Sequence, residues 1–164
     1  MEDNIELPVL EIANFFWHGT MSLYEYVCIA SFVKNGFNVN VYSYHELKLP
    51  IGAHLKNAAE ILPESDLLKY TQDGKKGNLA AFSDAFRINL QKNHLGWWFD
   101  TDMVCLKSSK DFAQLAEKDN RIIVGFQDDH VINGAVLKIS DKQLAGKIFT
   151  ELEQSGTSFE WGYI

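Results

Sequence analysis

The residues with the clearest potential for chemistry are two aspartates that follow a short aromatic run. The run is Trp97 to Phe99, and Asp100 and Asp102 come directly after it, separated by one threonine. Aromatic residues in succession are typical of a buried strand. If the strand continues, the two carboxylates point the same way, about 7 Å apart. Like charges on one side indicate a divalent cation, because Mg²⁺ or Mn²⁺ takes one or two carboxylates and completes its octahedron with water and phosphate oxygens.

A second polar group lies just upstream, within a helical pattern. Asn78 is a candidate N-cap and Gly96 follows the last periodic residue. Ser83, Asp84 and Arg87 are three or four residues apart, so they share one face of this helix. Polar side chains on an otherwise apolar surface indicate contact with a polar ligand. The alternatives are a Ser83 hydroxyl bonded to a backbone carbonyl, and a surface pair of Asp84 and Arg87 worth only about 0.3–0.5 kcal/mol. The apolar positions of the pattern are Leu79, Phe82, Phe86 and Leu90.

Taken together, the segments A-A-F-S-D-A-F-R and G-W-W-F-D-T-D-M-V-C-L resemble the core of sugar-nucleotide glycosyltransferases of the GT-A type. The group in question is the DXD-containing sugar-transferase family, which includes yeast α-1,6-mannosyltransferase, α-1,4-glycosyltransferases and the catalytic domains of the clostridial glucosylating toxins. Bacterial members often act in capsule or other surface-polysaccharide assembly. The specific part of the resemblance is Leu79 to Leu106, and a weaker likeness extends from near Phe15 to the last residue.

The resemblance implies a retaining, metal-dependent glycosyltransferase that moves a sugar from a UDP- or GDP-sugar donor to a saccharide or other hydroxyl acceptor in polysaccharide biosynthesis. Asp100 and Asp102 would be its catalytic residues. Asp102 would bind Mn²⁺ or Mg²⁺ directly, and Asp100 would bind it through water and hold ribose or sugar hydroxyls. Similar proteins continue beyond Ile164 and supply a further metal ligand, so transfer by this stretch alone stays open. The residues expected to bind the donor are Trp17, Ser83, Asp84, Arg87, Trp98, Asp100 and Asn133.

Length and composition narrow the class of protein. A chain of 164 residues makes one domain, and a net charge of −7 argues against a nucleic-acid surface. No stretch resembles a signal peptide or reaches the ~20 apolar residues of a membrane span. Cys28 and Cys105 lie in apolar contexts and are expected to be reduced core residues. We therefore expect a cytoplasmic protein, either free or attached peripherally at the inner membrane face.

The remaining pattern predicts an α/β fold. A strand over 12–17, a helix over 22–35 and a strand over 39–44 make a β-α-β start, which is usually right-handed and parallel. Ser22 and Glu25 form a capping box for this helix, whose apolar stripe is expected at Leu23, Tyr26, Val27, Ala30 and Val33. Helices are expected over 111–117 and 141–154, and strands over 121–126 and 135–139, with a turn or bulge at Asn133-Gly134. Together with the resemblance, this predicts one GT-A domain over 1–164, a mixed sheet flanked by helices that lacks its C-terminal part.

Two stretches are less clearly assigned. Residues 45–76 are broken by prolines and glycine, with a short helix expected near 57–62, and the lysines of the turn over 73–77 are either solvated or close to a phosphate. The loop at 127–130 contains Asp128, Asp129 and His130, which are interpreted as a second metal site or as a loop facing solvent or substrate.

Two other functions remain open. The run F-D-T-D-M-V fits the pattern of haloacid-dehalogenase-type phosphohydrolases, in which Asp100 would be the nucleophile and Asp128-Asp129 the downstream acidic pair. Against this, that motif normally follows the first strand of the chain. The other alternative is a binding module that takes up a metal–nucleotide complex and transfers nothing.

Overall fold

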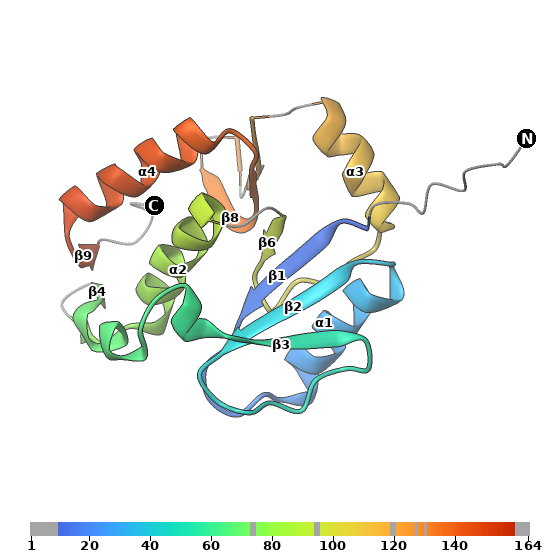
Figure 1. The fold of residues 1–164 in the computed structure, drawn as a ribbon, viewed down its shortest axis with the longest axis horizontal. Coiled ribbons are helices and arrows are strands. Elements are labelled where there is room, and N and C mark those ends of the chain that lie inside the picture. Colours follow the sequence, from blue (N-terminus) through green and yellow to red (C-terminus); the bar gives the residue numbers. More distant parts are fainter. Residues whose placement is uncertain are drawn as a thin grey trace, which may run out of the picture.

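The computed structural model describes residues 10–72, 75–93, 96–118, 121–126, 128–129 and 131–159, and it has an α/β architecture with a mixed six-stranded sheet flanked by helices (Figure 1). The main elements are β1 (Ile12–Phe16), α1 (Leu23–Lys34), β2 (Asn38–Ser43), β3 (Ala53–Asn57), α2 (Leu79–Asn93), β6 (Trp97–Phe99), α3 (Ser109–Lys118), β7 (Ile122–Phe126), β8 (Ile132–Ile139) and α4 (Lys142–Ser155). The shorter ones are the 3-10 helices η1 (Ala58–Glu60) and η2 (Glu64–Lys69) and a small sheet of β4 (Thr71–Gln72), β5 (Lys75–Lys76) and β9 (Ser158–Phe159).

The strand order of the large sheet is β3-β2-β1-β6-β8-β7. β1 runs parallel to both β2 and β6, and β3 runs parallel to β2, so four carboxyl ends lie at one edge. β8 is antiparallel to both β6 and β7. The chain leaves β1 toward β2 on one side and later returns as β6 on the other. Ligands of open α/β sheets bind outside such a reversal of strand order.

The sheet separates two hydrophobic cores. One contains α2 and α4, which contact each other (Figure 1), and the other contains α1 and α3. The strand β6 contributes to both, because its side chains alternate: Trp98 lies in the α2 core, and Trp97 and Phe99 lie in the α1 core. All three are buried, as the aromatic run predicts.

The predicted helix boundaries are confirmed at their caps. Ser22 and Glu25 form the expected capping box of α1. The Asn78 side chain accepts hydrogen bonds from the backbone N–H groups of Ala80 and Ala81 at the start of α2. Gly96 has φ of 132°, and a Cβ there would lie 2.9 Å from that of Ile12, so only glycine fits where the chain turns into β6.

The predicted apolar stripe of α1 is wrong. Leu23 is 77% exposed and Val27 is also exposed, whereas Cys28, Ile29 and Phe32 are the buried residues. The helix carries apolar residues around most of its circumference, so its sequence offers more than one stripe. Packing of Phe32 against the aromatic core selects the buried one.

The stretch before α2 contains structure that the sequence did not predict. β3 is an edge strand with mostly exposed side chains, so it has no alternating apolar pattern. The short helix expected near 57–62 is the single turn η1, and Lys75 and Lys76 are exposed in β5. The predictions at residues 1–9, 73–74, 127, 130 and 160–164 lie outside the described residues.

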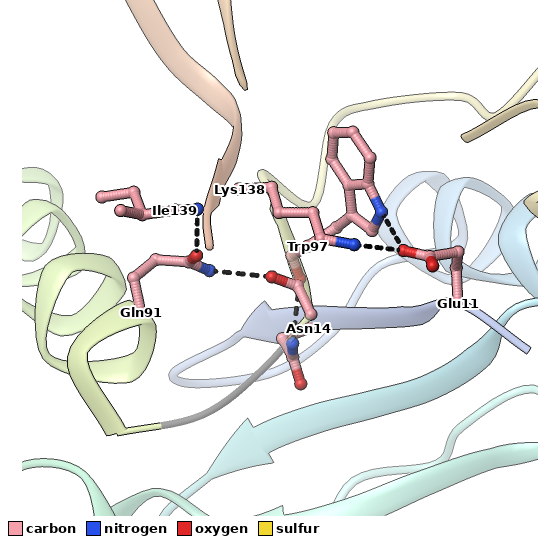
Figure 2. Close-up of polar contacts among 7 residues, drawn as sticks. Glu11, Asn14, Gln91, Trp97, Lys138 and Ile139 are labelled. Carbon is pink, nitrogen blue, oxygen red and sulfur yellow. Dashed lines mark hydrogen bonds and ion pairs between the residues drawn. The ribbon is translucent and has the colours of Figure 1, made fainter. Parts of the chain in front are cut away.

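A polar network joins β1, β6 and β8 near the amino-terminal ends of β1 and β6, where the antiparallel β8 has its carboxyl end (Figure 2). The Asn14 side chain donates to the Trp97 carbonyl at 2.9 Å, and the Trp97 indole N–H donates to Glu11 at 2.6 Å. Gln91 at the end of α2 accepts from the Ile139 backbone N–H at 2.8 Å and donates to the Gly96 carbonyl at 3.2 Å. Its amide therefore continues the hydrogen bonding of β8 beyond the amino-terminal end of β6.

We predict that Gln91→Met lowers the free energy of unfolding by about 1–3 kcal/mol, because it leaves the buried Ile139 N–H without an acceptor. Gln114→Met, at an exposed position on α3, is the matched control and should change little. Urea unfolding followed by circular dichroism measures both. Equal stability of the two variants would show that the amide bridge does not hold β8.

Candidate functional site

Asp100 lies at the carboxyl end of β6, on the α2 face of the sheet. One carboxylate oxygen accepts a hydrogen bond from the Trp98 indole N–H at 2.8 Å. The Asp100 backbone N–H donates to the Ala135 carbonyl of β8 at 2.9 Å. Trp98 is 1% exposed and packs near Phe86 of α2, so its position is fixed by the core. The carboxylate is thus held by its own strand, and the backbone that carries it is held by the neighbouring one.

The expectation that Asp100 and Asp102 project from one extended segment is wrong. The chain turns after Asp100, whose carbonyl accepts from the Met103 N–H at 3.2 Å, and the Asp102 side chain is exposed. The turn occurs because the following residues cross to the α1 face, where Ser31 and Asn35 bond to the backbone of Cys105. Both acids remain at the same end of β6, on either side of a turn.

An ion pair on α2 completes this group. Arg87 Nη2 lies 2.8 Å from Asp84 Oδ1, and the two side chains are only 9% and 27% exposed, so this is not a pair on the helix surface. Burial raises the pKa of Asp84 to about 6; the Arg87 charge opposes this shift and the Asp100 charge adds to it. Burial also raises the pKa of Asp100, where the Trp98 hydrogen bond and Arg87 oppose the shift and Asp102 adds to it. The three acids and the guanidinium therefore form one electrostatic cluster, here called the acid–arginine cluster.

β8 covers the guanidinium of this cluster. A Cβ added to Gly134 would overlap the guanidinium group of Arg87, so the arginine fits only because residue 134 has no side chain. The neighbouring Asn133 accepts from the Ala135 N–H at 2.7 Å and lies opposite Gly125, where the register between β7 and β8 shifts. The predicted bulge is confirmed, and it brings the β8 backbone close to the arginine.

The other predicted site residues are distributed as follows. Ser83 is half-buried on α2 beside Asp84. Trp17, directly after β1, packs against the α1 core, on the other face of the sheet from the acid–arginine cluster. Its indole N–H is buried without a hydrogen-bond partner among the described residues. Asp128 and Asp129 are exposed, and Asp128 accepts from the Val131 N–H at 3.0 Å. The structure brings together Asp84, Arg87, Trp98, Asp100 and Gly134, but not Trp17.

Sequence reasoning missed one group at the same edge of the sheet. His18, His45 and Glu64 each offer a ligand atom, and these atoms lie within 4.8 Å of one another. The first two follow β1 and β2, whose parallel pairing was predicted, so a search for polar residues just after these strands would have found them. Glu64 gives no such signal, because its approach depends on the fold of the stretch after β3.

Cys28 and Cys105 are both buried and free, as expected. No helix in the described ranges has both the length and the apolar character that crossing a bilayer requires. Comparison of the sequence with protein-family models finds no match, and comparison with curated proteins finds none either.

We predict that the free energy of unfolding falls as pH rises from about 4 to 7. Asp84 has a folded pKa of about 6 against a usual value of 3.8, so the folded state holds the extra proton in this window. The stability linked to that proton is fully present below pH 3.8 and is lost as pH passes about 6. Unfolding by urea at a series of pH values measures the slope.

The variant Asp84→Asn should flatten this fall. Asp111→Asn is the matched control: hydrogen bonds from Ser108 lower the Asp111 pKa, so its removal should make the fall no smaller. A slope that is the same in Asp84→Asn as in the original chain would contradict a raised pKa at Asp84.

We also predict that Gly134→Ala displaces Arg87 and costs about 1–3 kcal/mol of stability, as overpacking of a close contact does. Gly146 is the matched control, because a Cβ there meets nothing within 4 Å. Since it lies inside α4, Gly146→Ala should stabilise the protein by roughly 0.5–1 kcal/mol. Thermal unfolding measures both, and equal stabilisation by the two substitutions would show that the arginine does not need the space.

Proposed function

We propose that this chain is a metal-dependent glycosyltransferase domain of the GT-A type, which binds a nucleoside diphosphate sugar at the carboxyl edge of the sheet between β1 and β6. The observation that carries the proposal is the acid–arginine cluster: Asp100, fixed at the end of the central strand, shares its surroundings with Asp84 and Arg87. The reversal of strand order beside β1 supports the same location.

The charges of the cluster suit a divalent cation. Asp84, Asp100 and Asp102 carry three negative charges when ionised and Arg87 carries one positive charge, so two negative charges remain. Burial is the main cause of the raised pKa values of Asp84 and Asp100, and repulsion from a neighbouring acid adds to each shift. The donor atoms are carboxylate oxygens, which Mg²⁺ and Mn²⁺ prefer. The exposed side chain of Asp102 suits a direct ligand of an ion that keeps several waters and phosphate oxygens.

The family resemblance implies a role for each residue, and the observed positions are compatible with these roles. Asp102 would hold the ion, and Asp100, restrained by Trp98, would bind it through water and accept hydrogen bonds from ribose or sugar hydroxyls. Arg87 offsets the charge of the diphosphate, and Asp84 orients that guanidinium and reaches the donor sugar. The ion, when bound, stabilises the negative charge that builds on the leaving diphosphate. The residues therefore contribute by positioning the donor and by electrostatic stabilisation.

The proposed substrates are a UDP- or GDP-sugar donor and a saccharide or other hydroxyl acceptor, with retention of anomeric configuration. Ser83, Trp17 and Asn133 remain proposed contacts to the donor, and Trp17 would approach it from the α1 side of the edge. A thermal-shift screen of sugar nucleotides with and without Mn²⁺ identifies the donor. Hydrolysis of a simple phosphate monoester without any nucleotide would instead favour a phosphohydrolase with Asp100 as nucleophile. Donor binding without transfer or hydrolysis would identify a binding module.

We predict that Asp102→Asn weakens Mn²⁺-dependent binding of UDP or GDP by at least ~10-fold, because loss of a metal ligand costs no less than loss of a residue that orients one. Asp129→Asn, at another exposed acid, is the matched control and should bind as the original chain does. Isothermal titration calorimetry with and without Mn²⁺ measures the effect. Unchanged affinity in Asp102→Asn would remove Asp102 from the site.

A further inference from the structure

A second group of metal-ligating side chains lies at the carboxyl edge of the sheet, outside the acid–arginine cluster. His18 Nε2 is 3.4 Å from Glu64 Oε1, and His45 Nε2 is 3.1 Å from the same oxygen. The three ligand atoms lie within 4.8 Å of one another. Each of the two imidazoles therefore approaches the same carboxylate oxygen through its own Nε2 atom. These residues are here called the histidine–glutamate cluster.

Three separate elements deliver these side chains, and backbone contacts hold each in place. His18 follows the exit of β1, where the Trp17 N–H donates to the Tyr42 carbonyl of β2 at 3.0 Å. The His45 N–H donates to Ser43 Oγ at 3.2 Å just past the end of β2.

Glu64 is the first residue of η2, which Tyr44 holds against the end of β2. The Tyr44 hydroxyl donates to the Leu62 carbonyl at 2.7 Å, two residues before Glu64. The fold of this edge of the sheet therefore already places the three side chains close together.

A hydrogen-bonded group without metal is the simplest alternative, since each Nε2–H could donate to the carboxylate. One histidine suffices for such a contact, however, and here two from different strands converge. The side chains of His18, His45 and Glu64 are 29%, 57% and 48% exposed, so the cluster is open to solvent and an ion can enter. This leaves a coordination position for water or another ligand.

We propose that the histidine–glutamate cluster binds Zn²⁺. Two imidazoles, one carboxylate and a water make a four-coordinate donor set that zinc takes in proteins. Tetrahedral bonds of about 2.0–2.1 Å place neighbouring ligand atoms roughly 3.3 Å apart, which both histidine–carboxylate separations already approach. The ring nitrogens lie within 4.8 Å of each other, and their side chains are exposed enough to adjust to this spacing. The set contains nitrogen, so it differs from the all-oxygen set of the acid–arginine cluster, which suits Mn²⁺ or Mg²⁺.

The ion would join the ends of β1 and β2 to η2. The ion would thereby fix η2 at the edge of the sheet where the proposed donor site lies. Because the ion binds only the folded arrangement, it should raise the unfolding temperature as its concentration exceeds the dissociation constant. The inference stands independently of glycosyltransferase activity, because it uses none of the residues of the acid–arginine cluster.

The test is a titration of the metal-free full chain with Zn²⁺, followed by calorimetry and thermal unfolding. One equivalent should bind with micromolar or tighter affinity and raise the unfolding temperature. Each of His18→Ala, His45→Ala and Glu64→Gln should weaken binding by at least ~10-fold, the lower bound seen for loss of a group that only orients a ligand. Cobalt substituted for zinc should give the visible absorption of a four-coordinate site, and this absorption should be lost in the same variants.

The matched controls are His54→Ala on β3 and Glu60→Gln on η1, which should bind Zn²⁺ as the original chain does. Circular dichroism checks that every variant is folded. The proposal is overturned if the folded original chain binds no Zn²⁺, or if the three cluster variants bind it unchanged. It is equally overturned if Asp102→Asn, and not the histidine variants, abolishes zinc binding, since the ion would then occupy the acid–arginine cluster.

Discussion

The hydrogen bond from the Trp98 indole to the Asp100 carboxylate is the contact on which the rest of the candidate site depends. Trp98 is buried for hydrophobic reasons, but its indole N–H requires an acceptor once it leaves water. The first residue beyond β6 on the same face supplies that acceptor. The contact that gives the buried indole N–H its acceptor therefore also fixes a carboxylate at the end of the central strand, beside the reversal of strand order.

This arrangement has an electrostatic cost that the neighbouring elements offset in part. Burial disfavours the charged forms of Asp84 and Asp100 and raises the pKa of each. The positive charge of Arg87 opposes both shifts. Its guanidinium can lie beside these acids because Gly134 leaves space under β8. The remaining negative charge is the physical reason to expect a cation here.

On the other side of β1, the histidine–glutamate cluster offers nitrogen ligands, so one edge of the sheet presents two donor sets of different chemistry.

Much of this fold could be predicted from the sequence where local signals agree with packing. The capping residues Ser22 and Asn78 set the starts of α1 and α2, and the aromatic run identified β6. The spacing of Asp84 and Arg87 placed both on one helical face, where their pairing was the alternative to contact with a ligand; the structure shows the pair, but largely buried.

The sequence-based predictions were wrong or incomplete where contacts between distant parts of the chain decide the local structure. The chain turns at Asp100 because Ser31 and Asn35 hold the backbone of Cys105 on the other face, which strand periodicity cannot indicate. The edge strand β3 has no apolar alternation to reveal it. The histidine–glutamate cluster needs three elements in their final positions, so no local pattern contains it.

The central claim is that a divalent cation binds at the end of β6, beside Asp100 and Asp102. Paramagnetic line broadening by sub-stoichiometric Mn²⁺ in the amide spectrum of the chain tests it most directly. The account predicts that the first resonances to broaden are those around Asp100 to Met103, together with Ala135 of β8 and Tyr24 of α1, whose hydroxyl contacts the Asp102 carbonyl. Broadening that begins elsewhere, for example at Asp128 and Asp129, and leaves the end of β6 sharp would contradict it.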